Sequence, residues 1–304
     1  MARGRFIVCF DFELAWGRFD KVFDENYLAQ VRLTRKEVVP SLLAILERHR
    51  VPATWAVVGH LMLRACDGVH SELEPYRPEH CPDWFSRDAG GKDDGDSMWM
   101  CRDVVAQIAE CPTPQELASH SFSHVDFSHP ALSRKRVMQE LERTRDLIAG
   151  FGQEMRTHVF PRGRGGHLDV LKEAGVQVYR TLLQPPSGFG SGLTRFTAEA
   201  FARTPSLVTP ERDEMGMLKA DGGMLFNRRG RYRSAIPMSR RVARAIKGIN
   251  AAAREGGVFV LWSHPRDFAS DQKIMLRAFD EICAHAARMR DTGRLEIIPV
   301  RELA

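Results

Sequence analysis

The sequence predicts an α/β protein built on a parallel β-sheet that is either open or closed into a barrel. Short apolar runs alternate along the chain with longer segments of helical periodicity. This alternation is typical of strand–helix–strand units with right-handed crossovers, which build parallel sheets. The 304 residues fit two small domains or one large barrel. No repeat or low-complexity linker divides the chain, so we expect a single domain over residues 1–304.

Six short apolar runs are typical of strands, because each is too short for a helix and ends in polar or turn-forming residues. The first run ends in acidic residues. The last run ends before Pro299, which cannot continue a central strand. The expected strands cover residues 5–11, 53–58, 157–160, 176–179, 258–262 and 295–298.

Capping residues mark the beginnings of several helices. Thr34 and Glu37 have the spacing of a capping box, and they precede a segment with apolar residues on one face. Pro40 removes a backbone donor from that helix, so we expect a slight kink. Ser133 is the expected N-cap of a helix that Gly150 ends. Further helices are expected over residues 167–173, from residue 239 onwards and over residues 272–289.

The strand–helix alternation is interrupted from residue 67 to residue 102 by glycine, proline, aspartate and aromatic residues. We interpret this segment as a long loop insertion and not as a domain boundary, because the alternation resumes after it. Long loops in compact folds often carry function. Residues 184–223, which are rich in glycine, proline and threonine, predict no clear element.

Cysteine usage and hydropathy suggest a compartment. The six cysteines include no CxxC pair, and the first apolar run, residues 6–10, is far shorter than the ~20 residues that span a bilayer. We therefore expect reduced thiols and a cytoplasmic protein without a transmembrane segment. The spacing of Cys81, Cys101 and Cys111 matches no familiar zinc knuckle, so we interpret them as loop cysteines.

Positive charge is concentrated in one segment. The net charge is +5, yet residues 222–254 contain no acid and nine bases. Such a segment can bind a phosphate-bearing ligand, nucleic acid or an anionic membrane surface, or it can be the solvated face of a basic helix.

Acidic and histidine side chains occur where the expected strands end, which in a parallel barrel is the face that carries active sites. Asp11 and Glu13 end the first strand, and period-two alternation places both on the same side of it. Two nearby carboxylates need a cation or a proton, although one of them could instead pair with an arginine. His120 and His124 have the i, i+4 spacing that lets two imidazoles on a helical turn reach one ion. With a strand-end carboxylate they would make a 2-His-1-carboxylate site with open coordination positions.

Two further strand ends carry candidate residues. Arg162 follows the strand over residues 157–160, where it could pair with a carboxylate, grip an anionic substrate or lie on the surface. His264 follows the most apolar strand. There it could donate a proton near neutral pH or simply bond to the backbone.

Taken together, these four strand-end motifs resemble those of the polysaccharide deacetylases, the NodB-homology family also known as carbohydrate esterase family four. The resemblance extends from residue 6 to residue 303, and its most specific parts are the HSxSH and WSHP elements. The motifs occur in the order Asp11-Phe12-Glu13, His120-Ser121-Phe122-Ser123-His124, Phe160-Pro161-Arg162 and Leu261-Trp262-Ser263-His264-Pro265.

The resemblance implies a distorted (β/α) barrel and the hydrolysis of acyl groups on sugars with a divalent metal, which we expect to be zinc, with cobalt, manganese and nickel as alternatives. It implies that Asp11 is the catalytic base, that His264 is the general acid and that Arg162 orients the base. His120 and His124 match the metal ligands of the family. Where the family usually has a second, adjacent aspartate, this chain has Glu13, so whether Asp11 or Glu13 contacts the metal stays open.

The expected function is therefore removal of an N-acyl group, acetyl in the first instance, from an amino sugar. The sugar belongs to a polysaccharide or to an intracellular nucleotide- or lipid-linked precursor used in envelope assembly. We expect Trp262 or Trp16 to stack on the sugar ring and the basic segment to bind the phosphate. Two alternatives are a metal-independent amidohydrolase similar to the allantoinases, and a non-catalytic polyanion-binding protein. We do not expect a nucleic-acid partner, because it would leave four strand-end motifs unexplained.

Overall fold

A single curled sheet forms the centre of the molecule. The computed structural model describes residues 3–21, 23–181, 191–230 and 234–304, and within them ten strands belong to this sheet. Every paired strand in it is parallel to its neighbour, except that β8 is antiparallel to β9. In sheet order the strands are β10 (Met224–Leu225), β11 (Val258–Ser263), β1 (Gly4–Phe12), β2 (Ala53–Val57), β5 (Glu116–Ser119), β6 (Thr157–Val159), β7 (Val178–Arg180), β9 (Leu218–Lys219) and β8 (Glu211–Arg212), and β12 (Leu295–Ile297) pairs with β1.

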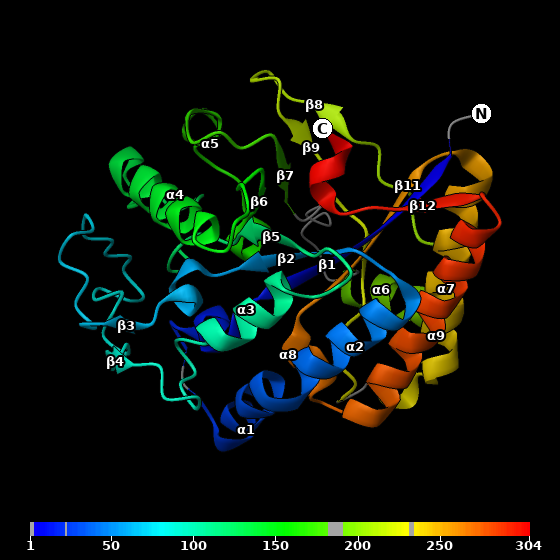
Figure 1. Cartoon of the computed structure of the whole chain (residues 1–304), viewed down its shortest axis with the longest axis horizontal. Helices are drawn as coiled ribbons and strands as arrows, with labels where there is room; N and C mark the ends of the chain where they lie inside the picture. The colour runs from blue at the N-terminus through cyan, green and yellow to red at the C-terminus, as the bar shows by residue number, and fades with distance from the viewer. Residues whose placement is uncertain (1–2, 22, 182–190, 231–233) are drawn as a thin grey trace.

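The curled sheet confirms the expected α/β fold with a distorted barrel. Across the described residues, β8 and β10 end the strand order without pairing with each other, so the barrel is not closed. Figure 1 shows β1 and β2 crossing the middle of the molecule, with α2, α3 and α8 on one side of them. The two chain termini lie on the same side of the molecule (Figure 1).

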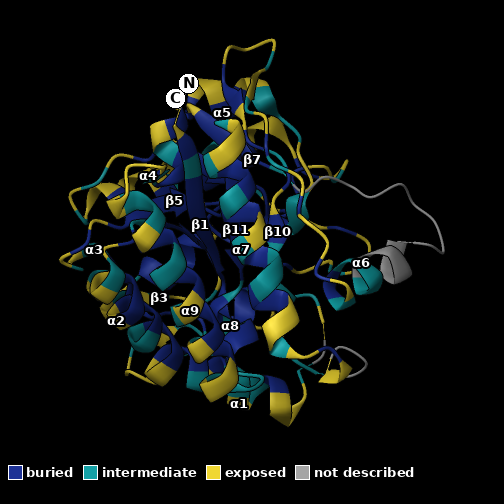
Figure 2. Ribbon diagram, turned by 90° about the vertical axis from the view of Figure 1, so that its right-hand side faces the viewer, coloured by how far each residue is buried: buried dark blue, intermediate teal, exposed yellow. Residues whose placement is uncertain are grey.

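Helices wrap the outside of this sheet and leave its strands buried (Figure 2). Within the described residues, none of them is both long enough and apolar enough to cross a membrane. In chain order they are α1 (Glu25–Leu33), α2 (Val39–His49), α3 (Arg102–Ala109), α4 (Arg134–Ala149), α5 (Leu168–Glu173), α6 (Ser191–Ala200), α7 (Met238–Glu255), α8 (Pro265–Phe268) and α9 (Gln272–Asp291).

The side chains of β1 alternate between the helices on one face of the sheet and the interior of the barrel on the other. Phe10 packs toward the helices, with ring centroids 4.5 Å from Trp55 and 5.7 Å from Phe279. Cys9 belongs instead to the second hydrophobic cluster, inside the barrel. Because successive side chains of a strand point to opposite faces, Asp11 follows Cys9 into the interior, where apolar packing gives way to the cavity described below.

The expected capping box at Thr34 is wrong. The helix begins earlier, at Glu25, where the Asp24 carboxylate accepts a hydrogen bond of 2.7 Å from the backbone N–H of Tyr27. Thr34 lies inside it and donates its hydroxyl to the carbonyl of Gln30. The backbone widens into a π-helical turn at Thr34–Val38 just before Pro40, which lacks the N–H needed for an α-helical bond.

The long insertion is present as expected, and it contains one small piece of regular structure. Strand β4 (Gly91–Lys92) lies in the insertion and pairs antiparallel with β3 (Ala65–Cys66), which directly precedes the insertion, on the periphery in Figure 1. Helices α3 and α6 and the short strands β8, β9 and β10 were not expected. They are short or lie in segments without clear periodicity.

We predict that Phe10→Ala lowers the free energy of unfolding by ~3–5 kcal/mol, because it opens a cavity in the aromatic cluster between β1 and the helices. Phe201→Ala is the matched control. Its side chain is 68% exposed, and the change should stay within ~0.5 kcal/mol. Urea unfolding of both variants measures the difference, and equal effects would contradict this description of the core.

Candidate metal centre and active site

Two carboxylates at the end of β1 face one cavity. Asp11 is the penultimate residue of the strand and Glu13 directly follows the strand, and both line a cavity of about 270 Å³. Each is only 6% exposed. The period-two prediction that placed them on one side of the strand is therefore confirmed.

The two histidines reach this cavity from a loop and not from the expected helical turn. His120 directly follows β5, and the chain then turns back through irregular backbone to His124. Ser121 and His124 both have a φ of 58°, in the left-handed region that side chains other than glycine rarely adopt. These two positions reverse the chain, and the imidazoles end with ring centroids 5.0 Å apart. Such strain persists where the surroundings fix it, often at functional sites.

Three donor atoms converge in the cavity. The Nε2 atom of His124 lies 3.0 Å from Oε2 of Glu13, and Nε2 of His120 lies 3.7 Å from the same oxygen. The three ligand atoms lie within 4.8 Å of one another. Two imidazoles and a carboxylate are the protein ligands of many catalytic zinc sites, which keep a fourth position open.

Both histidines have a ring nitrogen that is available to a metal. The Nδ1 atom of His120 lies 2.7 Å from the carbonyl oxygen of Val159, which can only accept, so Nδ1 carries the proton and Nε2 presents its lone pair. Neither ring nitrogen of His124 has a hydrogen-bond partner among the described residues, although the ring is buried. Burial is the largest effect on His124 and lowers its pKa, although the Glu13 carboxylate acts in the opposite direction. A neutral, unpartnered imidazole beside a carboxylate fits a metal ligand.

Glu13 stays charged in this buried position. Burial alone would raise its pKa, but the positive charge of His264 and the adjacent imidazoles of His120 and His124 outweigh burial. The pKa of Glu13 therefore lies well below its ordinary value. The backbone of Gly17 packs directly against the Glu13 carboxylate, and a Cβ atom at that position would overlap it.

Hydrogen bonds to a buried ion pair of α4 fasten the histidine loop to that helix. Ser123, between the two histidines, donates its N–H to Oε2 of Glu140 at 2.7 Å and its hydroxyl to Oε1 at 2.6 Å. Arg136 completes this network with a hydrogen bond of 2.8 Å to the same Oε1 atom. All three side chains are buried, so the bonds hold the loop without competition from water.

The arginine that holds Asp11 is not the expected one. Arg180, at the end of β7, donates a hydrogen bond to Oδ1 of Asp11. Arg162 instead pairs with Asp20 at 2.7 Å. The reason is backbone geometry: Arg162 sits in a 3₁₀ turn with a φ of 58°, so it lines the cavity from its rim, whereas Arg180 is fully inside the barrel.

His264 faces the same carboxylates from the end of β11. Its Nδ1 atom lies 3.3 Å from Oδ2 of Asp267, and its Nε2 atom lies 3.7 Å from Oε1 of Glu13. Burial lowers the pKa of His264, but the charges of Glu13 and Asp267 outweigh it and raise the pKa to about 9. An imidazole in this position can hold a proton at the cavity.

The two tryptophans expected at the sugar differ in position. Trp262 lines the cavity, and its ring lies under the guanidinium of Arg180 at 4.8 Å. Trp16 does not line it: the side chain is fully buried, stacked on Phe19, with its indole N–H bonded to the carbonyl of Trp99. The stacking role expected for Trp16 is therefore wrong, because the helical turn after Glu13 rotates it into the core.

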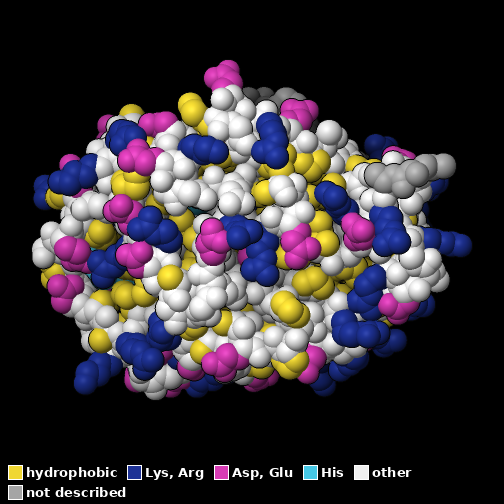
Figure 3. Space-filling view, turned by 45° about the horizontal axis from the view of Figure 1, so that its top comes forward, with side chains coloured by type: hydrophobic (Ala, Val, Ile, Leu, Met, Phe, Trp, Pro, Cys, Tyr) yellow, Lys and Arg dark blue, Asp and Glu magenta, His cyan; other side chains and the backbone are white. Residues whose placement is uncertain are grey.

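The described residues of the basic segment do not line the cavity. No described residue of the segment over 222–254 lines it, and Arg231 and Arg233 lie outside the described residues. On the face drawn in Figure 3, basic and acidic side chains are interspersed. Several bases of the segment contact other parts of the protein, namely Arg229 with Asp271, Arg241 with the carbonyl of Asn227, Arg244 with the carbonyl of Arg203 and Lys247 with the carbonyl of Ala202.

Sequence reasoning missed three residues of the site. Arg180 ends a strand in the same way as the candidates that were found, and extending that strand by one residue would have included it. Asp267 lies three residues after His264, within reach of its ring across one turn of α8. Gly17 gives no signal in the sequence, because its contact with Glu13 depends on the turn between them.

Comparisons with known proteins show the family and the fold of this chain. A family model described as polysaccharide deacetylase matches residues 21–181, just over half of the chain. No curated protein matches the sequence. A candidate polysaccharide deacetylase from Mycobacterium smegmatis superimposes with a TM-score of 0.62 at 13% identity, covering 100% of this chain and 90% of that one.

Two further solved structures share the fold. A probable polysaccharide deacetylase from Pseudomonas aeruginosa PAO1 has a TM-score of 0.60 at 10% identity, covering 99% of this chain and 90% of that one. The allantoinase Puue has a TM-score of 0.60 at 10% identity, covering 99% of this chain and 89% of that one. At these identities, the likeness shows a common fold and not a common activity.

We predict that Gly17→Ala weakens zinc binding by roughly 10- to 100-fold, because the new methyl group displaces the Glu13 carboxylate. Gly150→Ala is the control: this glycine ends α4 with a φ of −64°, away from the cavity. Titration of metal-free protein with zinc compares the two variants. Equal affinity in both would show that Glu13 does not bind the ion.

Proposed function

Since the chain belongs to the polysaccharide deacetylase family, we propose that it is a metal-dependent hydrolase that removes an N-acyl group, in the first instance acetyl, from an amino sugar. The observation that carries this proposal is the convergence of Glu13, His120 and His124 in one cavity with Asp11 and His264. This arrangement combines a metal-binding triad with a candidate base and a candidate acid.

The three converging donors fit a zinc ion, and they are the residues that would hold it. When bound there, the ion supplies a Lewis acid that polarises the acyl carbonyl and lowers the pKa of water. Glu13 is the carboxylate ligand in this proposal. Its Oε2 atom lies close to both imidazoles, whereas Asp11 accepts a hydrogen bond from Arg180.

Asp11 acts as the general base. The buried Arg180 fixes the direction of its carboxylate through their hydrogen bond, so the carboxylate is held at the cavity beside the triad. Asp11 takes one proton from the attacking water as the water oxygen bonds to the acyl carbon. Proton transfer to a positioned group of this kind contributes roughly 10²–10⁴-fold to the rate.

His264 acts as the general acid. Asp267 approaches its Nδ1 atom, which leaves Nε2 directed at the cavity. His264 gives its proton to the amide nitrogen as the carbon–nitrogen bond breaks, and the products are a carboxylic acid and the free amino sugar. The adjacent acidic groups Glu13 and Asp267 favour the protonated imidazole that this step requires.

The cavity limits the size of the substrate. Its volume of about 270 Å³ is at the small end of ligand sites, which typically span ~300–1,000 Å³. We propose that it takes the acyl group and the sugar ring that carries it, with Trp262 against the ring. Arg162 and Arg266 also line the cavity and are available to hydroxyl or anionic groups of the sugar.

Two finer expectations from the sequence stay predictions: that the sugar is carried on a nucleotide or lipid phosphate, and that the protein works in the cytoplasm. Comparing turnover of a free N-acetyl amino sugar with that of its nucleotide-linked form tests the first. Equal turnover would contradict a phosphate-binding role.

The allantoinase-like alternative requires no metal. We predict that removing metal with a chelator abolishes turnover and that zinc restores it, because the ligand atoms of Glu13, His120 and His124 converge on one point in the cavity. Metal content and released acid are measured on the same samples. Turnover that is indifferent to the chelator would favour the metal-independent alternative.

We predict that Asp11→Asn keeps its metal but loses about 10²–10⁴-fold in kcat, since an amide cannot take the proton of water. His124→Ala should lose both the metal of this site and turnover. Elemental analysis and kinetics on both variants separate the two roles. If Asp11→Asn turns over normally, another group is the base; if it loses its metal, Asp11 is a ligand.

A further inference from the structure

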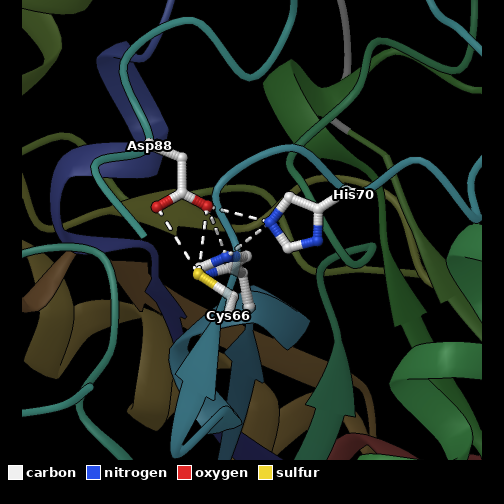
Figure 4. Close-up of side chains that lie close together, drawn as sticks. Cys66, His70 and Asp88 are labelled. Carbon is white, nitrogen blue, oxygen red and sulfur yellow. Dashed lines mark hydrogen bonds and ion pairs between the residues drawn. The ribbon is translucent and has the colours of Figure 1, made fainter. Parts of the chain in front are cut away.

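A second cluster of metal-ligating side chains lies outside the catalytic cavity, where β2 leads into the long insertion. His60 is in the 3₁₀ turn Gly59–Met62, Cys66 is in β3, and His70 and Asp88 belong to the insertion itself. One ligand atom from each lies within 4.8 Å of the others. Figure 4 shows the Asp88 carboxylate facing both the ring of His70 and the sulfur of Cys66.

The distances inside this cluster are short. Oδ2 of Asp88 lies 2.8 Å from Nε2 of His60 and 2.9 Å from Nε2 of His70, and the two nitrogens are 3.1 Å apart. The sulfur of Cys66 lies 3.4 Å from the same oxygen. The side chains of His60, His70 and Asp88 are at most 1% exposed, so water does not separate them.

The hydrogen bonds around the cluster direct lone pairs into it. Nδ1 of His60 lies 2.9 Å from the carbonyl oxygen of Trp99, which can only accept, so Nδ1 carries the proton. Nε2 of a neutral His60 therefore points a lone pair at the carboxylate of Asp88 and at Nε2 of His70. Oδ1 of Asp88 is occupied by the N–H of Gly90, which leaves Oδ2 facing the imidazoles. Buried lone pairs that meet in this way need a cation or an added proton between them.

We propose that His60, Cys66, His70 and Asp88 bind a structural zinc ion, separate from the catalytic one. Two imidazoles, a thiolate and a carboxylate complete a tetrahedral shell, and a shell made only of protein ligands is typical of structural zinc. Thiolate and imidazole ligands also disfavour magnesium and calcium, which prefer oxygen. On binding, the Cys66 S–H bond breaks, the sulfur bonds to zinc and the proton leaves to solvent.

The size of the cluster agrees with zinc. Bonds of ~2.0–2.3 Å in a tetrahedron place ligand atoms about 3.3–3.8 Å from one another. The sulfur–oxygen separations of 3.4 and 3.7 Å fall in this range. The contacts of Asp88 with the imidazoles are a few tenths of an ångström shorter, so a modest outward shift of these side chains accommodates the ion.

The position of the cluster connects it to the catalytic site. The backbone N–H of His60 donates to the carbonyl of Phe122, and that of Gly59 donates to the carbonyl of Ser121, both between the two catalytic histidines. The carbonyl of Trp99 that holds the His60 ring also accepts from the indole of Trp16, just after Glu13. Zinc bound here would cross-link the insertion to the segments that position the catalytic triad.

Cobalt spectroscopy on the full chain tests this site independently of catalysis. Cobalt(II) bound to a thiolate gives a charge-transfer absorption in the near ultraviolet, and a site of only histidine and carboxylate does not. Metal-free protein is titrated with cobalt, and zinc stoichiometry is measured by elemental analysis. The variants are Cys66→Ser, His124→Ala and the control Cys111→Ser, which changes another partly buried cysteine.

We expect about two zinc ions per wild-type chain and the thiolate band in the wild-type protein. Cys66→Ser should lose the band, whereas Cys111→Ser and His124→Ala should keep it. A wild-type protein that binds cobalt without this band would overturn the proposal, as would a band that survives Cys66→Ser. If added protons and not a metal ion hold the cluster together, the wild-type protein will bind cobalt without the thiolate band.

If Cys66→Ser fails to fold, wild-type protein that binds cobalt without the thiolate band still overturns the proposal. The proposed catalytic function fails separately, through turnover that persists in His124→Ala or in chelated protein. The thiolate band would persist even if the catalytic proposal were wrong, because none of the four proposed ligands of the second site belongs to the catalytic triad.

Discussion

One buried negative charge organises the catalytic end of this barrel. Glu13 lies almost out of contact with water, and the imidazoles that stabilise its charge come from two other strand ends: His120 and His124 after β5, and His264 after β11. A carboxylate in such a place must be paired, since an isolated buried charge is very costly. The imidazoles of His120 and His124 are also the ones that we propose as ligands of a divalent ion, so the same atoms would meet the electrostatic requirement and the catalytic one.

Much of the surrounding structure keeps these atoms in place. The histidine loop adopts two left-handed residues, and the Ser123–Glu140–Arg136 network offsets that strain from the α4 side. The carbonyl of Val159 fixes the His120 ring. On the opposite side, His60 connects the histidine loop to the insertion. The insertion therefore supports the site although none of its residues lines the cavity.

The sequence predicted the parts of this arrangement that depend on local pattern. Alternation along β1 was enough to place Asp11 and Glu13 together, and the order of strand-end motifs was enough to bring the histidines to them. Contacts set by loop geometry were not predictable. Arg162 and Arg180 both end strands, and only the left-handed turn at Arg162 decides which of them reaches Asp11. Trp16 was expected to stack on the sugar, but the 3₁₀ turn that follows Glu13 buries its ring in the core. His60 and Asp88 are too far apart in the chain, and too ordinary in their surroundings, to have been grouped before folding.

The central claim is that Glu13, His120 and His124 bind a single ion beside Asp11. Anomalous diffraction from crystals of the zinc-loaded protein tests it most directly. The structure predicts an anomalous peak about 2.0–2.2 Å from Nε2 of both histidines and from a Glu13 oxygen, with Asp11 held by Arg180. A zinc-loaded crystal with no peak between these three side chains, or with the peak coordinated by Asp11 in place of Glu13, would contradict it.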